Sequence, residues 1–199
     1  MRGLFVTFEG IDRSGKTTQA GLLVDALGDE ALGVREPGGT PAGERLRDIL
    51  KDPEVALAPE TEALLFAAAR SELVANVVLP ALDAGKVVVS DRFLDSSLAY
   101  QGGARGLGIE DVERVNHFAT RGLRPDITFL LDLSPAEAAA RVGESDRFEE
   151  EGSELQAAVG AAYERLMRLD PDRWRRLDAT RSPEEVHADV LAAVEAARE

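Results

Sequence analysis

The sequence predicts an α/β fold of three layers, in which helices flank a five-stranded parallel sheet. Short apolar runs alternate with helical patterns along the whole chain. These runs are continuously apolar, which is typical of strands covered on both faces. No internal repeat or convincing interdomain linker interrupts the order, so we expect residues 1–199 to form a single domain.

The expected strands are the apolar runs bounded by turn or polar residues. They cover residues 3–9, 32–35, 86–91, 126–133 and 173–178. Parallel strands joined through helices imply right-handed crossovers. Ligands of such a sheet bind beyond the carboxyl ends of its strands.

Helical patterns fill the segments between the strands. The first follows the first strand and ends at Gly28, a residue type that commonly terminates helices. A longer region begins at Pro59, runs to residue 84 and is expected to be interrupted near Pro80. The other helical patterns cover residues 40–50, 109–121, 135–142, 155–169 and 186–194.

The first strand leads into a glycine-rich segment that matches the phosphate-binding pattern G-x-x-x-x-G-K-[ST]. Glycines let consecutive N–H groups converge on phosphate oxygens, and the following helix points its positive end at the same anion. The lysine adds a cation and the threonine a hydroxyl for Mg²⁺. The segment with its next residue is Gly10, Ile11, Asp12, Arg13, Ser14, Gly15, Lys16, Thr17 and Thr18.

Missing motifs narrow the choice among proteins with such a P-loop. The guanine-specificity pattern Asn-Lys-x-Asp is absent, because Asn precedes none of the lysines, Lys16, Lys51 and Lys86. The transporter-ATPase signature Leu-Ser-Gly-Gly-Gln is absent as well. Small-molecule kinases therefore remain the favoured class.

The third expected strand ends in Asp91 and Arg92. An acidic residue at the end of a buried strand in a P-loop fold is placed to organise Mg²⁺ or its waters, and the arginine then stands beside the phosphates. A helix cap with a neutralising partner is the alternative interpretation of this pair. We expect Thr17 and Asp91 to face the metal.

Composition excludes several other functions. A net charge of −14 argues against a broad nucleic-acid-binding surface, which needs clustered basic residues. The chain has no 18-residue uncharged apolar run and no signal-peptide organisation. We therefore expect no membrane partner and a cytoplasmic location. With no cysteine, thiolate catalysis and a cysteine-ligated metal are excluded. The two histidines, His117 and His187, are too few and too far apart in sequence to suggest a metal cluster.

A polar segment near the last third of the chain has little to bury and is bounded by glycines. Its composition fits a mobile lid and a plain solvated loop equally. Arg147 within acidic surroundings favours a lid, which we expect over about residues 141–152.

Five blocks of sequence resemble the thymidylate kinase family, whose members transfer the γ-phosphoryl group of ATP to dTMP. The blocks are FEGIDRSGKTTQ (8–19), REPGGTPAGERLR (35–47), LLFAAAR (64–70), SDRFLDSSLAYQGGARG (90–106) and SDRFE (145–149). The resemblance runs in order from residue 3 to about residue 181. It implies a P-loop nucleoside-monophosphate-kinase-like fold, ATP and Mg²⁺ as cofactors, dTMP as acceptor, and a homodimer formed through the helices near 40–50 and 59–84.

The resemblance also implies an acceptor site. Phe66 is similar to the aromatic residue that stacks on thymine, although alone it would indicate core packing. Arg70 is similar to the arginine that hydrogen-bonds the base, and Tyr100 to the tyrosine beneath the deoxyribose, where it disfavours a 2′-hydroxyl. The other implied residues are Ser97 and Gln101 in the base-reading segment, Glu9 and Asp12 near the acceptor sugar and phosphate, and Arg35 and Arg92 on the acceptor phosphate.

The implied reaction needs no general base, because a phosphate with a second pKa of about 6 is largely dianionic near neutrality. The obstacle is repulsion between two anions, so catalysis must come from in-line positioning and from screening by Lys16, Mg²⁺ and arginines. Family members place the catalytic arginine either in the P-loop, at the position of Arg13, or in the lid, where this chain has Arg141 and Arg147. We expect Arg13 to contribute and Arg147 to close over ATP.

Two other functions remain open. A deoxynucleoside kinase of the same fold would need a carboxylate base for a neutral 5′-hydroxyl, and Glu9 is the candidate. A non-catalytic nucleotide-binding switch is the second alternative. The presence of Lys16, Thr17, Asp91 and Arg92 argues against it.

Overall fold

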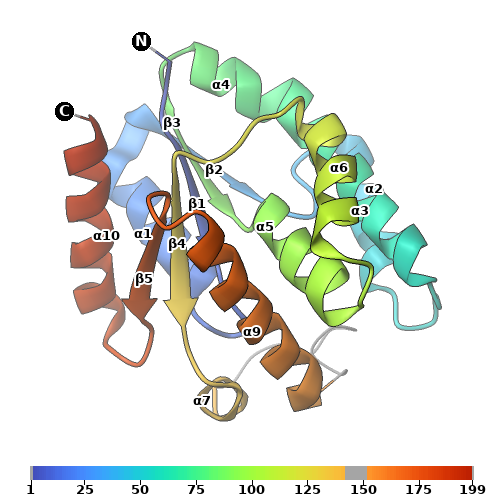
Figure 1. Cartoon of the computed structure of the whole chain (residues 1–199). Helices are drawn as coiled ribbons and strands as arrows, with labels where there is room; N and C mark the ends of the chain where they lie inside the picture. Colours follow the sequence, from blue (N-terminus) through green and yellow to red (C-terminus); the bar gives the residue numbers. More distant parts are fainter. Residues whose placement is uncertain (1, 142–151, 199) are drawn as a thin grey trace.

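The computed structural model describes residues 2–141 and 152–198. Its strands form one parallel five-stranded sheet in the order β2-β3-β1-β4-β5 (Figure 1). The strands are β1 (Phe5–Glu9), β2 (Ala31–Arg35), β3 (Val87–Asp91), β4 (Ile127–Asp132) and β5 (Trp174–Asp178). The predicted sheet is confirmed.

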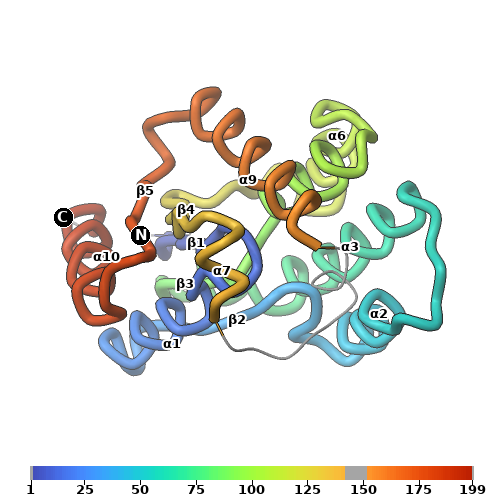
Figure 2. The backbone as a smooth tube through the Cα atoms, turned by 90° about the horizontal axis from the view of Figure 1, so that it is seen from below, coloured from blue at the N-terminus to red at the C-terminus, as the bar shows by residue number. Residues whose placement is uncertain are grey.

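Helices cover both faces of the sheet. α1 (Lys16–Leu27) and α10 (Pro183–Arg198) pack against each other on one side, and α6 (Ile109–Thr120) and α9 (Gly152–Leu169) lie on the other (Figure 2). The remaining helical elements are η1 (Gly28–Glu30), α2 (Pro41–Lys51), α3 (Pro59–Leu73), η2 (Val74–Val78), α4 (Leu79–Asp83), α5 (Leu94–Ser97), η3 (Leu98–Ala104) and α7 (Pro135–Ala139).

The core is one cluster of apolar side chains that includes both faces of the central strands. Phe5 lies on one face of β1 and Val6 and Phe8 lie on the other, and all three are fully buried. Phe5 meets Phe93 edge-on at 4.8 Å between ring centroids, and Phe8 stacks on Phe129 at 5.2 Å. Each such side chain contributes about 1.5–3 kcal/mol by leaving water. The continuously apolar strands therefore reflect burial on both sides.

Strand register brings the functional ends of three strands to one edge. Phe8 of β1 is opposite Asp91 of β3, and Arg35 of β2 is opposite the same Asp91. Glu9, which follows Phe8, lies at this edge too. The segments after β1, β2 and β3 therefore meet above the carboxyl ends of the sheet.

The helix runs from Pro59 to Asp83 without a break at Pro80, so the expected interruption is present only as a change of helix type. The reason lies one turn earlier, in the π-helical turn Val74–Val78. There the N–H of Leu79 bonds to the carbonyl of Val74, five residues back. Pro80 then follows as the second residue of α4.

Other helix boundaries also differ from the expectation. α7 ends at Ala139 rather than 142, and α5 with η3 forms a helical segment over Leu94–Ala104 that periodicity did not predict. The side chain of Arg141, just beyond α7, binds carbonyl groups of the P-loop. Gly28 ends α1 with a positive φ of 53°, as expected.

Among the described residues, the continuous helix Pro59–Asp83 is the one long and apolar enough to cross a membrane, with a mean hydropathy of 1.4. Its Leu73, Val74 and Val78 are fully buried in the protein core. The same helix carries Arg70, which is 1% exposed and forms an ion pair inside the protein. These contacts are those of a core helix.

Candidate active site

The P-loop joins β1 to α1 and encloses the ammonium group of Lys16. Gly10 has a φ of +142°, and a Cβ there would lie 2.8 Å from the carbonyl oxygen of Leu131, so the turn requires glycine. Lys16 donates to the carbonyl of Ile11 at 2.6 Å and to Ser14 Oγ at 3.3 Å. Burial and the neighbouring charge of Arg92 lower the pKa of Lys16 to about 8. A cation held this way favours an anion entering the loop.

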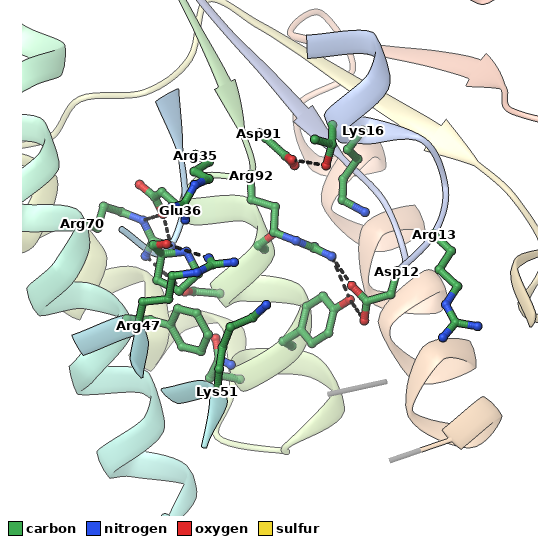
Figure 3. Close-up of a pocket in the computed structure, with 17 residues that line it drawn as sticks. Asp12, Arg13, Lys16, Arg35, Glu36, Arg47, Lys51, Arg70, Asp91 and Arg92 are labelled. Carbon is green, nitrogen blue, oxygen red and sulfur yellow. Dashed lines mark hydrogen bonds and ion pairs between the residues drawn. The ribbon is translucent and has the colours of Figure 1, made fainter. Parts of the chain in front are cut away.

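A cavity of about 340 Å³ opens beside the P-loop, above the carboxyl ends of β1, β2 and β3 (Figure 3). It brings together most of the side chains that the sequence predicts for the site. The lining residues are Asp12, Arg13, Lys16, Thr17, Arg35, Glu36, Pro37, Arg47, Lys51, Phe66, Arg70, Asp91, Arg92, Ser96, Ser97, Tyr100 and Gln101.

Arg92 is fixed on several sides before any ligand is present. One terminal nitrogen donates to the carbonyl of Gly10 at 3.2 Å and to Ser96 Oγ at 3.1 Å. The other donates to Asp12 Oδ1 and to the hydroxyl of Tyr100, and Figure 3 shows Arg92 and Asp12 facing each other. Arg92 also adopts a left-handed backbone with a φ of 70°, a strained state that persists only when neighbours hold it. The guanidinium is thus preorganised.

Asp12 is the ionised partner of Arg92. Burial raises the pKa of this carboxyl, but the charges of Arg92 and Lys16, with hydrogen bonds from Gln156 and Tyr100, outweigh burial and lower it. The carboxylate therefore stays charged at neutral pH. It lines the cavity in which the acceptor group is expected to bind.

Glu9 lies beneath the cavity rather than in its lining, unlike the acceptor-contacting acid that the resemblance implies. Its carboxylate accepts hydrogen bonds from the Phe93 N–H at 2.8 Å, Ser96 Oγ at 2.6 Å and the Tyr163 hydroxyl at 2.7 Å. Burial, and then the charge of Asp95, raises the pKa of Glu9 to about 7. A carboxylate enclosed in this way is poorly placed to take a proton from a substrate hydroxyl.

The titration of Glu9 gives a first prediction. Its folded pKa of about 7 lies above the ordinary 4.5, so the folded state binds more protons between these values. Stability is therefore expected to fall as pH rises from 5 to 8, by roughly 1–3 kcal/mol. Glu9→Gln removes this contribution. Urea unfolding of both proteins at pH 5.5 and 7.5 tests it, and an equal pH dependence in the two proteins would contradict the assignment.

Arg35 is held at the cavity by α2. Its guanidinium donates to both carboxylate oxygens of Glu44 at 3.2 Å, and Glu44 accepts the Gly39 N–H at 2.7 Å. That backbone hydrogen bond is the main reason why the pKa of Glu44 is lowered. Arg47 and Lys51 of the same helix also line the cavity, and sequence reasoning missed both. Arg47 lies three residues after Glu44, and Lys51 lies four residues after Arg47, so all three share one helix face, which was the available signal.

Arg70 lies at the opposite end of the cavity and is 1% exposed. It donates to Glu36 Oε2 at 2.7 Å, to Ser97 Oγ at 3.1 Å and to the carbonyl of Phe93 at 3.1 Å. A further bond goes to Asn116 Oδ1. Within the described part of the chain, the other carboxylate oxygen of Glu36 has no hydrogen-bond partner.

The same end of the cavity combines one aromatic face with several hydrogen-bonding groups. Phe66 lies one helical turn before Arg70 and is half-buried in the lining. Gln101 also lines it while its amide nitrogen donates to Glu62 Oε1 at 2.9 Å. A planar surface beside guanidinium, hydroxyl and amide groups suits a pyrimidine base.

The two residues predicted to face Mg²⁺ lie side by side. Thr17 Oγ1 donates to Asp91 Oδ2 at 2.5 Å. Residues 2–141 and 152–198 contain no group of three or more His, Cys, Asp or Glu residues that could hold a metal alone. This donor set fits Mg²⁺, which is commonly bound through few protein oxygens together with phosphates and waters.

The arginines expected at the transferred phosphoryl group fall in different places. Arg13 lines the cavity, and its guanidinium donates to the carbonyl of Arg141 at 3.3 Å. Arg141 donates back to the carbonyls of Arg13 and Ser14 at 3.1 and 3.2 Å and to that of Ala179. It therefore braces the P-loop against the loop after β5. Arg147 and the predicted lid, apart from its two end residues, lie outside the described residues.

Comparison with known proteins agrees with this geometry. The family model for thymidylate kinase matches residues 8–190. A thymidylate kinase of Thermoanaerobacter sp. (strain X514) is 46% identical over 199 residues, which cover 98% of each chain. That of Caldanaerobacter subterraneus subsp. tengcongensis is 48% identical over 200 residues, covering 98% of this chain and 96% of the relative. The crystal structure of thymidylate kinase from Ehrlichia chaffeensis superposes with a TM-score of 0.81 at 30% identity, covering 98% of this chain and 100% of the other. The chain belongs to the thymidylate kinase family.

Proposed function

We propose that this protein transfers the γ-phosphoryl group of Mg²⁺-bound ATP to dTMP, with dTMP in the 340 Å³ cavity. Family membership makes it a nucleoside monophosphate kinase that acts on dTMP. The observation that carries the acceptor assignment is the polarity of the cavity. One end offers Phe66 and Arg70 to a base, and the other offers Arg92 beside the P-loop to a phosphate.

The mechanism follows from charge. The acceptor phosphate is already ionised, so no residue has to remove a proton, and the work is to bring two anions into line. Arg92 and Arg35 hold the acceptor phosphate, and Lys16 lies in the P-loop between the two substrates. Mg²⁺, held by Thr17 and Asp91 with phosphate oxygens, would neutralise donor charge when bound. The enclosed position of Glu9 disfavours a deoxynucleoside kinase, which needs a base.

An acceptor panel tests the assignment. Release of ADP from Mg·ATP is measured with dTMP, dUMP, dCMP, UMP and thymidine. We expect the highest kcat/KM with dTMP and a marked loss of kcat/KM with UMP. The reason is that Tyr100 lines the cavity, and we place it beneath the sugar, where it would disfavour a 2′-hydroxyl. Preference for any other acceptor would overturn the specificity. ATP turnover that no acceptor changes would indicate a nucleotide-binding switch.

We infer that Arg13 contributes to the transferred phosphoryl group and that Arg147 closes over ATP. Arg13→Ala and Arg147→Ala are each expected to lower kcat by about 10²-fold or more, since an arginine at this charge is worth 10³ or above in related reactions. Arg165→Ala, on the exposed face of α9, is the control. Measuring kcat for each variant decides the matter, because an unchanged value removes that residue from the mechanism.

We propose a second copy of this chain as partner. Three adjacent helices each expose a large apolar side chain, namely Ile49 (41%) on α2, Leu64 (57%) on α3 and Phe118 (88%) on α6. Covering them would remove apolar surface from water. Phe118→Asp is expected to shift the protein from dimer to monomer in sedimentation velocity, and an unchanged dimer would contradict this surface.

Use of ATP and dTMP fits a cytoplasmic location, which we also propose.

A further inference from the structure

Helix α9 reaches the acceptor site through Gln156, a residue that no sequence motif indicates. Its side-chain oxygen accepts the Asp12 N–H at 3.1 Å, and its amide nitrogen donates to Asp12 Oδ2 at 2.7 Å. The two residues are 144 positions apart in the chain. One side-chain amide thus forms hydrogen bonds with both the main chain and the carboxylate of the same P-loop residue.

This pair of hydrogen bonds fixes the orientation of the Asp12 carboxylate. Oδ2, which receives the amide of Gln156, also accepts the hydroxyl of Tyr100 at 3.1 Å. Oδ1 is left to face the guanidinium of Arg92. If the amide were removed, the carboxylate could rotate about its terminal bond, whose rotation is only weakly restricted.

The same face of α9 reaches Arg92 by a second route. Tyr163 lies two helical turns after Gln156, so both project toward the sheet. Its hydroxyl lies 3.0 Å from Ser96 Oγ, and that oxygen accepts a hydrogen bond from Arg92 at 3.1 Å. α9 therefore supports two of the side chains that bind the Arg92 guanidinium, namely Asp12 at one terminal nitrogen and Ser96 at the other.

We propose that Gln156 is a positioning residue for phosphoryl transfer, which sets the place of Arg92 by holding the main chain and carboxylate of Asp12. It does not line the cavity itself. The proposal rests on the proposed function, because Arg92 is there assigned to the acceptor phosphate. Misplacing such a group by about 1 Å can cost up to 10²-fold in rate.

The test uses Gln156→Leu, which keeps the side-chain size without hydrogen bonds. We expect kcat to fall about tenfold and the KM for dTMP to rise several-fold, while the KM for ATP stays within about twofold. Gln156→Glu, which keeps the acceptor but loses the donor and repels Asp12, is a second variant with the same expected direction. Glu154→Ala, on the exposed face of the same helix, is the matched control, and melting temperatures verify folding.

A double variant separates positioning from a structural role. If Gln156 acts through Asp12, Asp12→Ala with Gln156→Leu should be no slower than Asp12→Ala alone, within about twofold. A further fall equal to that of the single Gln156→Leu variant would overturn the proposal. So would wild-type kcat and KM for dTMP in either folded Gln156 variant. Wild-type protein that fails to phosphorylate dTMP would instead overturn the proposed function.

Discussion

Replacing Arg92 by methionine is expected to lower kcat/KM for dTMP by about 10³-fold, equivalent to about 4 kcal/mol. The substitution removes the proposed donor to the acceptor phosphate. It also leaves the Asp12 carboxylate, which pairs with Arg92 at the cavity wall, without its main counter-charge. Steady-state kinetics with varied dTMP at saturating ATP give the value.

Two further variants make the Arg92 result specific. Arg92→Lys keeps the charge but loses the forked donor geometry, so we expect it to recover only part of the activity. Arg114→Met makes the same change as Arg92→Met at a side chain that is 71% exposed, and it should leave activity unchanged. Wild-type activity in Arg92→Met would show that the acceptor phosphate does not bind at this end of the cavity.

Replacing Lys16 by methionine is expected to lower kcat by about 10²–10³-fold with a smaller change in the KM for dTMP. The ammonium is buried between the Ile11 carbonyl and Ser14 Oγ, and the negative groups Asp12 and Asp91 lie near enough to influence its pKa. We therefore expect it to stabilise charge where the transferred group passes rather than where the base binds.

Lys86→Met is the matched control for Lys16, because Lys86 is exposed and does not line the cavity. It should behave as the wild type. A Lys16→Met variant with an unchanged kcat and a raised KM for dTMP would show that the lysine serves only acceptor binding.

The sheet and the phosphate end of the site could be predicted because both depend on local sequence patterns. Apolar runs mark the strands, and the residues that follow β1, β2 and β3 meet because the carboxyl ends of parallel strands lie at one edge. Asp12, Arg35 and Arg92 line the cavity at these strand ends, while the family resemblance supplied the roles expected of them. Resemblance supplied Phe66, which periodicity alone would assign to the core.

The remaining contacts depend on packing between distant segments. Arg70 meets Glu36 and Asn116 only because α3 packs against α6 and its Arg70 reaches the loop after β2. Glu9 was expected at the acceptor, but the donors from α5 and Tyr163 of α9 enclose it. The continuous helix through Pro80 likewise depends on a widened turn that no local pattern indicates.

The most direct test of the account is a crystal structure of the enzyme with dTMP. We expect the thymine ring to lie against Phe66 within hydrogen-bonding reach of Arg70. The phosphate is expected beside Arg92 and Arg35 near the P-loop. Well-ordered dTMP with its base outside this cavity, or with its phosphate at the Arg70 end, would contradict the account.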